Sequence, residues 1–137
     1  MRALLPLALS ALLAFGACAQ DGKTEKSNPN KMDLNTVTDP TVKAALEAWQ
    51  AGDAAAWLSH FTADAKFTDD GNARDFKKFV KDACGHERFT SIDKVENGGK
   101  DITGAFHTEQ WGDFIVFFKF HKNSAGQFDG LDIGQVH

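Results

Sequence analysis

The sequence predicts an α+β domain in which about three helices precede an antiparallel sheet. Apolar residues recur at helical spacing between Val42 and Val80. After Arg88, apolar and polar residues alternate, as they do in half-buried strands. Turn signals divide this second part into strands, at Asn97–Gly99, Trp111–Asp113 and Asn123–Gly126. Helices followed by a run of strands are typical of α+β domains and not of alternating α/β domains.

Each helix has its own start and stop signals. Aspartate is a favoured N-cap and proline fits the first helical turn, so Asp39 and Pro40 begin the first helix and Gly52 ends it. Asp53 caps a second helix, whose apolar stripe is Trp57, Leu58 and Phe61. A short strand, Ala65–Asp69, and a third helix, Ala73–Cys84, follow before the strands.

Alternation assigns the faces of the late strand that ends near His121. One face is wholly apolar and is predicted to point inward: Phe114, Val116, Phe118 and Phe120. The other face is half polar and is predicted to point outward: Ile115, Phe117, Lys119 and His121.

The N-terminal segment reads as an export signal. Residues 1–19 combine Arg2, a short apolar run and small residues where a signal peptidase would cut. Cleavage after Ala19 and lipidation of Cys18 as a bacterial lipoprotein both fit this pattern. Residues 20–37 have the polar composition of a disordered tether, and residues 38–137 are the predicted domain. We therefore expect a protein that is exported, either in the periplasm or anchored to a membrane that faces it.

Composition narrows the function. The net charge is −4, and the strongest basic cluster is Lys77 and Lys78 with nearby Lys81, on the polar side of the third helix. A nucleic-acid partner is therefore not expected. Cys84 is the one cysteine after the predicted signal, so an internal disulfide is excluded. We expect its thiol to be a small buried group and not a nucleophile.

No metal site or cofactor is expected. If the late hairpin turns near Gly112, paired residues have numbers that sum to about 224, which places His107 opposite Phe117. His121 then lies roughly 13 Å further along the sheet, too far to share an ion with His107.

Residues Leu46–Asp70 resemble the opening of the nuclear transport factor 2-like superfamily, which is also called SnoaL-like or ketosteroid-isomerase-like. The shared features are a helix, Gly52-Asp53, a second helix that ends at His60-Phe61, and the segment Thr62–Ala65 that opens a strand. The resemblance extends over about 100 residues, from Thr38 to the C-terminus. It implies a cone-shaped curved sheet wrapped around the helices, with a pocket for a small apolar ligand on its concave side.

Asp69 is the first candidate for a functional residue. Alternation places it on the same face of its strand as Phe67, where an unpaired carboxylate is costly and its pKa would be raised. Ala65–Asp69 also matches the segment in which ketosteroid isomerases carry their general base. The positions of the other two isomerase groups are occupied by Ala45 and Phe118, and the chain has no tyrosine. A carboxylate that bonds the loop after Asp69, or caps the next helix, is the alternative.

His60 is the second catalytic candidate, as a partner for Asp69 in acid–base chemistry, unless it lies exposed at the helix edge. The residues expected to line a pocket are aromatic: Trp49, Trp57, Phe61, Phe67 and Phe118. The same aromatic stripes also fit an ordinary core.

Two functions stay open, and the sequence does not decide whether the protein is an enzyme. The first is a ligand-binding or accessory cone domain of the cell envelope, with an apolar small molecule as its partner. The second is a small isomerase, dehydratase or hydrolase that uses Asp69. In either case we expect a homodimer that forms through the convex outer face of the sheet.

Overall fold

The computed structural model describes residues 32–137. The predicted signal peptide, Cys18 and most of the predicted tether lie outside these described residues. The folded unit begins at Met32, and Leu34 and Val37 are buried in its core. The predicted domain boundary at Thr38 is therefore too late, because two apolar side chains of the expected tether pack against the domain.

Three helices precede most of the sheet, as the sequence predicts. The helix α2 (Pro40–Gln50) is capped by Asp39, whose carboxylate accepts hydrogen bonds from the amides of Thr41 and Val42 at 2.8 and 3.1 Å. The helix α3 (Ala54–Leu58) is capped by Asp53. The helix α4 (Phe76–Ala83) begins three residues later than predicted, because its cap is Asp75 and the preceding residues form a strand.

Seven strands form one curved, unclosed sheet, which confirms the predicted fold class. In chain order the strands are β2 (Phe61–Asp69), β3 (Asn72–Ala73), β4 (Glu87–Phe89), β5 (Lys94–Glu96), β6 (Asp101–Thr108), β7 (Gly112–Lys122) and β8 (Phe128–Gln135). They lie in the order β3-β2-β8-β7-β6-β4, and β5 also pairs with β6. The short 3-10 helix η3 (Asn97–Gly99) links β5 to β6. Among the strands of residues 32–137, β2 and β8 are the one pair that runs in parallel.

The strand β2 is longer than predicted. Phe61 was expected on the second helix, but it begins β2 and pairs with Phe128 of β8. Pairing with β8 is interrupted between Phe61 and Lys66, so the strand bulges there. The helix α3 is correspondingly short and ends at Leu58.

The hairpin of β6 and β7 is tighter than expected. His107 lies opposite Asp113, and Thr103 lies opposite Phe117, so paired residue numbers sum to 220 and the predicted sum of 224 is wrong. An even shift of partners leaves every side chain on its predicted face. Val116, Phe118 and Phe120 are accordingly buried, and Ile115 is 39% exposed.

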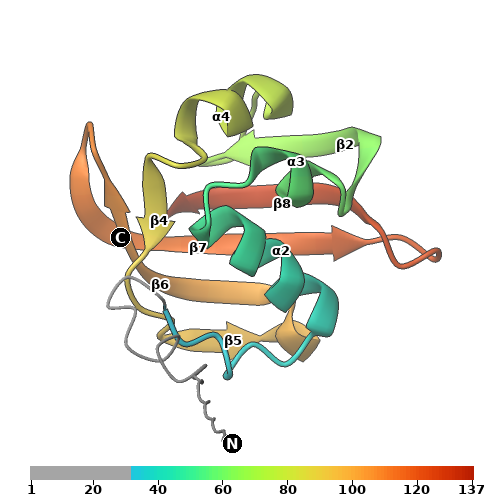
Figure 1. Cartoon of the computed structure of the whole chain (residues 1–137), viewed down its shortest axis with the longest axis horizontal. Coiled ribbons are helices and arrows are strands. Elements are labelled where there is room, and N and C mark those ends of the chain that lie inside the picture. The colour runs from blue at the N-terminus through green and yellow to red at the C-terminus, as the bar shows by residue number, and fades with distance from the viewer. Residues whose placement is uncertain (1–31) are drawn as a thin grey trace, which may run out of the picture. The chain divides into compact units, whose positions relative to one another are not determined.

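The core lies between the helices and one face of the sheet, which α2 and α3 cross in Figure 1, while α4 lies beside β2. Its centre is aromatic: the ring centroids of Trp49 and Trp57 are 4.9 Å apart, and that of Phe118 is 6.1 Å from Trp49. Edge-to-face contacts of this kind add to the free energy gained by apolar burial.

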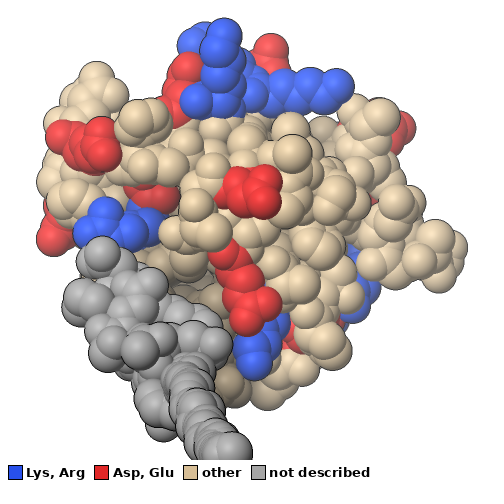
Figure 2. Space-filling model, viewed as in Figure 1, with Lys and Arg blue, Asp and Glu red and all other residues tan. Residues whose placement is uncertain are grey.

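Basic side chains gather at the α4 end of the face shown in Figure 2. This helix contributes Lys77, Lys78 and Lys81, and Lys78 forms an ion pair with Asp82 at 2.7 Å. Within residues 32–137, no helix is both long and apolar enough to cross a membrane.

Candidate functional site

A cavity of about 250 Å³ opens where the end of β2 meets α4, β4 and the β6–β7 hairpin. Apolar side chains form about half of its walls, and carboxylates lie among them. The lining residues are Asp69, Asp70, Phe79, Glu87, Phe106, Thr108, Trp111, Phe114, Val116, Phe118, Ile133, Gly134 and Gln135. Ligand sites typically combine apolar walls with a few converging polar groups. This cavity is therefore the candidate site.

Asp69 lines the cavity from the C-terminal end of β2. It lies on the same face as Phe67, which is 3% exposed, as the alternation predicts. Within residues 32–137, nothing donates a hydrogen bond to its carboxylate. Burial raises the pKa of Asp69, and the negative charge of Asp70 raises that pKa further, while Arg74 acts in the opposite direction.

The two structural roles that were the alternative for Asp69, bonding the loop and capping the next helix, are filled by Asp70 and Asp75. Asp70 Oδ1 accepts a hydrogen bond from the amide of Gln135 at 2.9 Å, which ties the loop to β8. Asp75 Oδ1 accepts from the amide of Lys78 at 3.1 Å and caps α4. Asp69 performs neither task, so its position beside an apolar cavity has no structural explanation in local capping.

Glu87 is the second carboxylate of the site, and it comes from β4. It pairs with Thr108 of β6, two residues before Phe89, whose side chain is 1% exposed. Burial raises the pKa of Glu87, and the negative charge of Asp69 raises that pKa further, against the opposing effect of His86. Two half-buried carboxyl groups with raised pKa values thus face one cavity.

Gln50 holds β4 in place at the end of α2. Its side-chain amide donates a hydrogen bond to the carbonyl of Phe89 at 2.9 Å and accepts one from the amide of Phe89 at 2.8 Å. This paired contact fixes the short strand that carries Glu87, although β4 has only three residues. Gln50 is therefore a positioning residue for the site.

The sequence analysis missed Glu87 and Trp111. Glu87 shares a strand face with Phe89, which is the same signal that identified Asp69 beside Phe67. Trp111 lies at the tip of the β6–β7 hairpin, where its side chain is 70% exposed. A large apolar side chain exposed in a predicted turn is the signal that could have identified it.

The predicted partner of Asp69 does not reach it. His60 directly precedes β2 and Asp69 ends it, so the two residues lie at opposite ends of a nine-residue strand. His60 is only half-buried and lies outside the cavity. His60 therefore does not share the cavity with Asp69, whereas Glu87 does.

Most of the predicted pocket aromatics belong to the core. Of that set, Phe118 alone lines the Asp69 cavity. Trp49, Trp57 and Phe67 are at most 3% exposed and fill the interior between the helices and the sheet.

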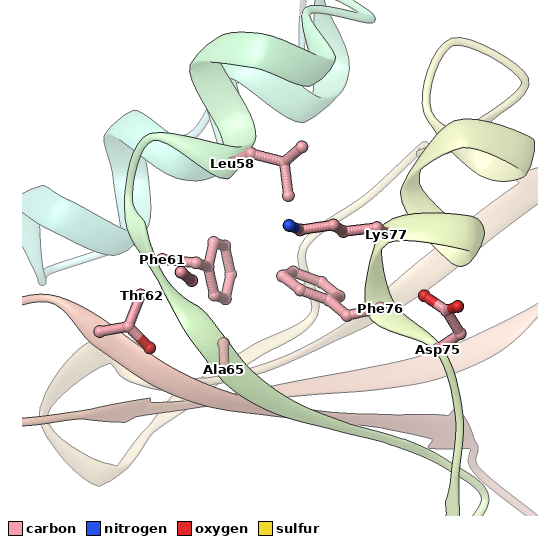
Figure 3. Close-up of a pocket in the computed structure, with 8 residues that line it drawn as sticks. Leu58, Phe61, Thr62, Ala65, Asp75, Phe76 and Lys77 are labelled. Carbon is pink, nitrogen blue, oxygen red and sulfur yellow. The ribbon is translucent and has the colours of Figure 1, made fainter.

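Phe61 lines a second, wider hollow of about 610 Å³ between α3, β2 and the start of α4. In Figure 3, Phe61 and Phe76 lie next to each other below Leu58, with ring centroids 4.7 Å apart and ring planes tilted by 60°, and the side chain of Lys77 extends over them. Asp75 also lines this hollow, but its carboxylate is engaged as the cap of α4. Converging unpaired polar groups distinguish the Asp69 cavity from this hollow, so we place the site at Asp69.

Metal and thiol chemistry have little support in residues 32–137. No group of three or more His, Cys, Asp or Glu side chains there lies close enough together to hold a metal ion. Burial raises the pKa of the Cys84 thiol, and the charge of Asp53 raises it further. A thiol with a raised pKa is a poor nucleophile at neutral pH.

The groups that could stabilise an oxyanion in an isomerase are also replaced. Ala45 is fully buried on α2, and Phe118 is 1% exposed on β7. The Thr108 hydroxyl is engaged on both sides, because it donates to the carbonyl of Gly112 and accepts from the amide of Trp111. The cavity can exchange protons through two carboxyl groups, but these three residues offer no free donor for a developing negative charge.

No protein-family model and no curated protein matches the sequence. Solved structures do match the fold. An NTF2-like protein of unknown function from Cytophaga hutchinsonii superposes with a TM-score of 0.57 and 12% identity over 77% of this chain and 91% of that chain. An NTF2-like protein of unknown function from Burkholderia pseudomallei superposes with a TM-score of 0.54. The identity is 14%, and the match covers 70% of this chain and 88% of that chain. The chain has the nuclear transport factor 2-like fold.

This NTF2-like fold also occurs in the orange carotenoid protein of Anabaena, solved with canthaxanthin bound. The TM-score is 0.61 at 14% identity, over 80% of this chain and 39% of that chain. Identities this low establish the fold alone. The expected cone fold is thereby confirmed for the NTF2-like unit described here.

Proposed function

We propose that this protein binds a small, largely apolar molecule in the cavity at Asp69. The observation that carries the proposal is an open cavity of about 250 Å³ with aromatic walls and two carboxyl groups that form no ion pair within residues 32–137. Pockets for drug-sized ligands measure about 300–1,000 Å³, so the ligand is a small one. The orange carotenoid protein of Anabaena, of which this chain matches 39%, binds the apolar ligand canthaxanthin, and this supports an apolar ligand here as well.

A cavity-filling substitution tests this proposal. Val116 lines the cavity and is 5% exposed, whereas Ile115 next to it lies on the opposite face of β7. Val116→Phe should abolish retention of the molecule that co-purifies with the wild-type domain, as measured by native mass spectrometry. Ile115→Phe adds a ring on the outer face and should leave retention unchanged. Equal retention by both variants would place the ligand elsewhere.

An acid–base enzyme is the second candidate, because Asp69 and Glu87 share the cavity and burial raises both pKa values. Carboxyl groups tuned in this way act as general acids or bases. If the protein is an enzyme, Asp69→Asn should stop conversion of the retained molecule while binding persists. The buried Ala45 and Phe118, at the positions of the isomerase donors, favour binding over catalysis.

We also propose that the protein is exported to the periplasm and anchored through Cys18. The apolar segment and the small residues before Cys18 support this proposal. Cys18→Ser should release the protein from the membrane fraction or stop its processing, as judged by fractionation and immunoblotting. A cleaved, soluble product in both wild type and variant would indicate ordinary secretion.

For assembly, we propose a homodimer through the outer face of the sheet. Ile115 is 39% exposed there, beside Phe117, Lys119 and His121. A mixed patch of this kind can pair and yet remain soluble when it is unpaired. Sedimentation should detect a dimer at about tens of micromolar that Ile115→Asp converts to monomer. A wild type that sediments as a monomer would refute the proposal.

A further inference from the structure

The walls of the Asp69 cavity carry negative charge that no lining residue balances. Asp69, Asp70 and Glu87 contribute carboxylates, and no Lys, Arg or His is among the lining residues. Arg74 and His86 lie near enough to affect the pKa values of Asp69 and Glu87, but neither forms an ion pair with them. The electrostatic potential in the cavity is therefore negative and attracts cations.

Two other carboxylates that are buried or half-buried in this domain, those of Asp39 and Asp132, each have a basic side chain as a partner. Asp39 accepts from the ammonium of Lys122 at 2.8 Å, and Asp132 accepts from the imidazole of His121 at 2.6 Å. Within residues 32–137, Asp69 and Glu87 have neither an ion pair nor a hydrogen-bond donor. Pairing is the usual condition for burying a carboxylate. The carboxylates of Asp69 and Glu87 therefore lack the partner that a buried carboxylate usually has.

The remaining wall is aromatic. Phe79, Phe106, Phe114 and Phe118 surround the cavity from α4, β6 and β7, and Trp111 stands at the exposed hairpin tip. The faces of aromatic rings attract cations, most strongly those of tryptophan, and they also pack against an apolar body. Aromatic rings beside carboxylates are the usual chemistry for recognising organic ammonium groups.

We propose that the cavity selects a small organic cation, in which an ammonium group faces Asp69 and Glu87 and an apolar body contacts the aromatic wall. This inference rests on the proposed binding function and adds the chemical class of the ligand. A metal ion fits less well, since no group of three metal-ligating side chains gathers within residues 32–137. Phenylalanine walls also offer no oxygen ligands.

Three probes of one shape and different charge test the proposal: benzylammonium, benzyl alcohol and benzoate. Each is titrated into the isotope-labelled wild-type protein at neutral pH while NMR follows the backbone amides of Phe106 and Val116. Benzylammonium should bind about tenfold more tightly than benzyl alcohol, the factor that roughly 1.4 kcal/mol of added binding energy produces. Benzoate should bind more weakly than either.

Variants then assign the selectivity to residues. Asp69→Asn and Glu87→Gln keep the shape of each side chain and should each reduce the preference for benzylammonium severalfold, with little effect on benzyl alcohol. Asp64→Asn is the matched control, because Asp64 is an exposed carboxylate on the same strand that does not line the cavity. Its preference should equal that of the wild type. The wild-type series decides the question by itself if a variant fails to fold.

The outcomes separate this inference from the function on which it rests. Equal binding of benzylammonium and benzyl alcohol at the cavity would overturn cation selectivity and leave ligand binding intact. A preference that survives in both cavity variants, or falls equally in Asp64→Asn, would show that general surface charge causes it and would also overturn the inference. If none of the three probes shifts the cavity amides, the proposed binding site fails together with the inference.

Discussion

Substituting Asp69 by asparagine should leave the fold as stable as the wild type or slightly more stable. The change removes a half-buried charge that accepts no hydrogen bond within residues 32–137, so no native contact is lost. It also removes repulsion from Asp70 and Glu87. We expect a gain on the order of 0.5 kcal/mol at neutral pH, because solvent reaches the carboxylate and screens that repulsion.

The pH dependence of this gain has a definite sign. Burial holds the pKa of Asp69 in the folded state above the ordinary value of 3.8, so the native protein keeps a proton that the unfolded chain has lost. The stability associated with that proton is fully present below pH 3.8 and is lost as pH rises through the folded-state pKa. The advantage of Asp69→Asn should therefore be greatest at neutral pH and should vanish towards pH 3.8.

Urea denaturation of wild type, Asp69→Asn and Asp75→Ala measures the effect. Asp75 is the matched contrast, because its carboxylate caps α4 and its loss should cost about 1 kcal/mol. For a domain of this size, that loss lowers the melting temperature by about 4–8 °C. If Asp69→Asn destabilises the protein as much as Asp75→Ala does, Asp69 has a structural bond and our account of the cavity is refuted.

Two further predictions concern the scaffold. Asp39→Ala should destabilise the domain by about 2–4 kcal/mol in urea denaturation, because it removes the α2 cap and leaves Lys122 without its partner. In a double-mutant cycle with Lys122→Met, the absence of coupling would contradict this explanation. Gly104→Ala should destabilise the domain by about 1–3 kcal/mol or more, because the added methyl group would overlap the carbonyl oxygen of Ser91. An unchanged melting temperature would show that the backbones of Gly104 and Ser91 are not packed this closely.

The helix starts and the strand faces could be predicted from the sequence, because the interactions that determine them act between residues close together in the chain. Asp39, Asp53 and Pro40 mark helix starts through contacts within one turn, and the structure uses them as predicted. Side chains alternate across a strand whatever its partners are. The inward face of β7 was therefore correct even though its register with β6 was not.

Other features depended on pairing between distant parts of the chain. The strand β2 extends back to Phe61 because Phe128, far along the sequence, pairs with it. No local signal distinguishes a helix end from such a strand start. The same limit applies to Trp49 and Trp57, which could have lined a pocket but pack against each other in the core.

The site itself was only half determined by the sequence. Asp69 could be recognised, because a carboxylate on the face of Phe67 needs an explanation within its own strand. The meeting of Asp69 with Glu87 required the closed arrangement of β2, β4 and the β6–β7 hairpin around one cavity. Local chemistry thus identifies a residue that is costly to bury, and tertiary packing decides which other residues share its environment.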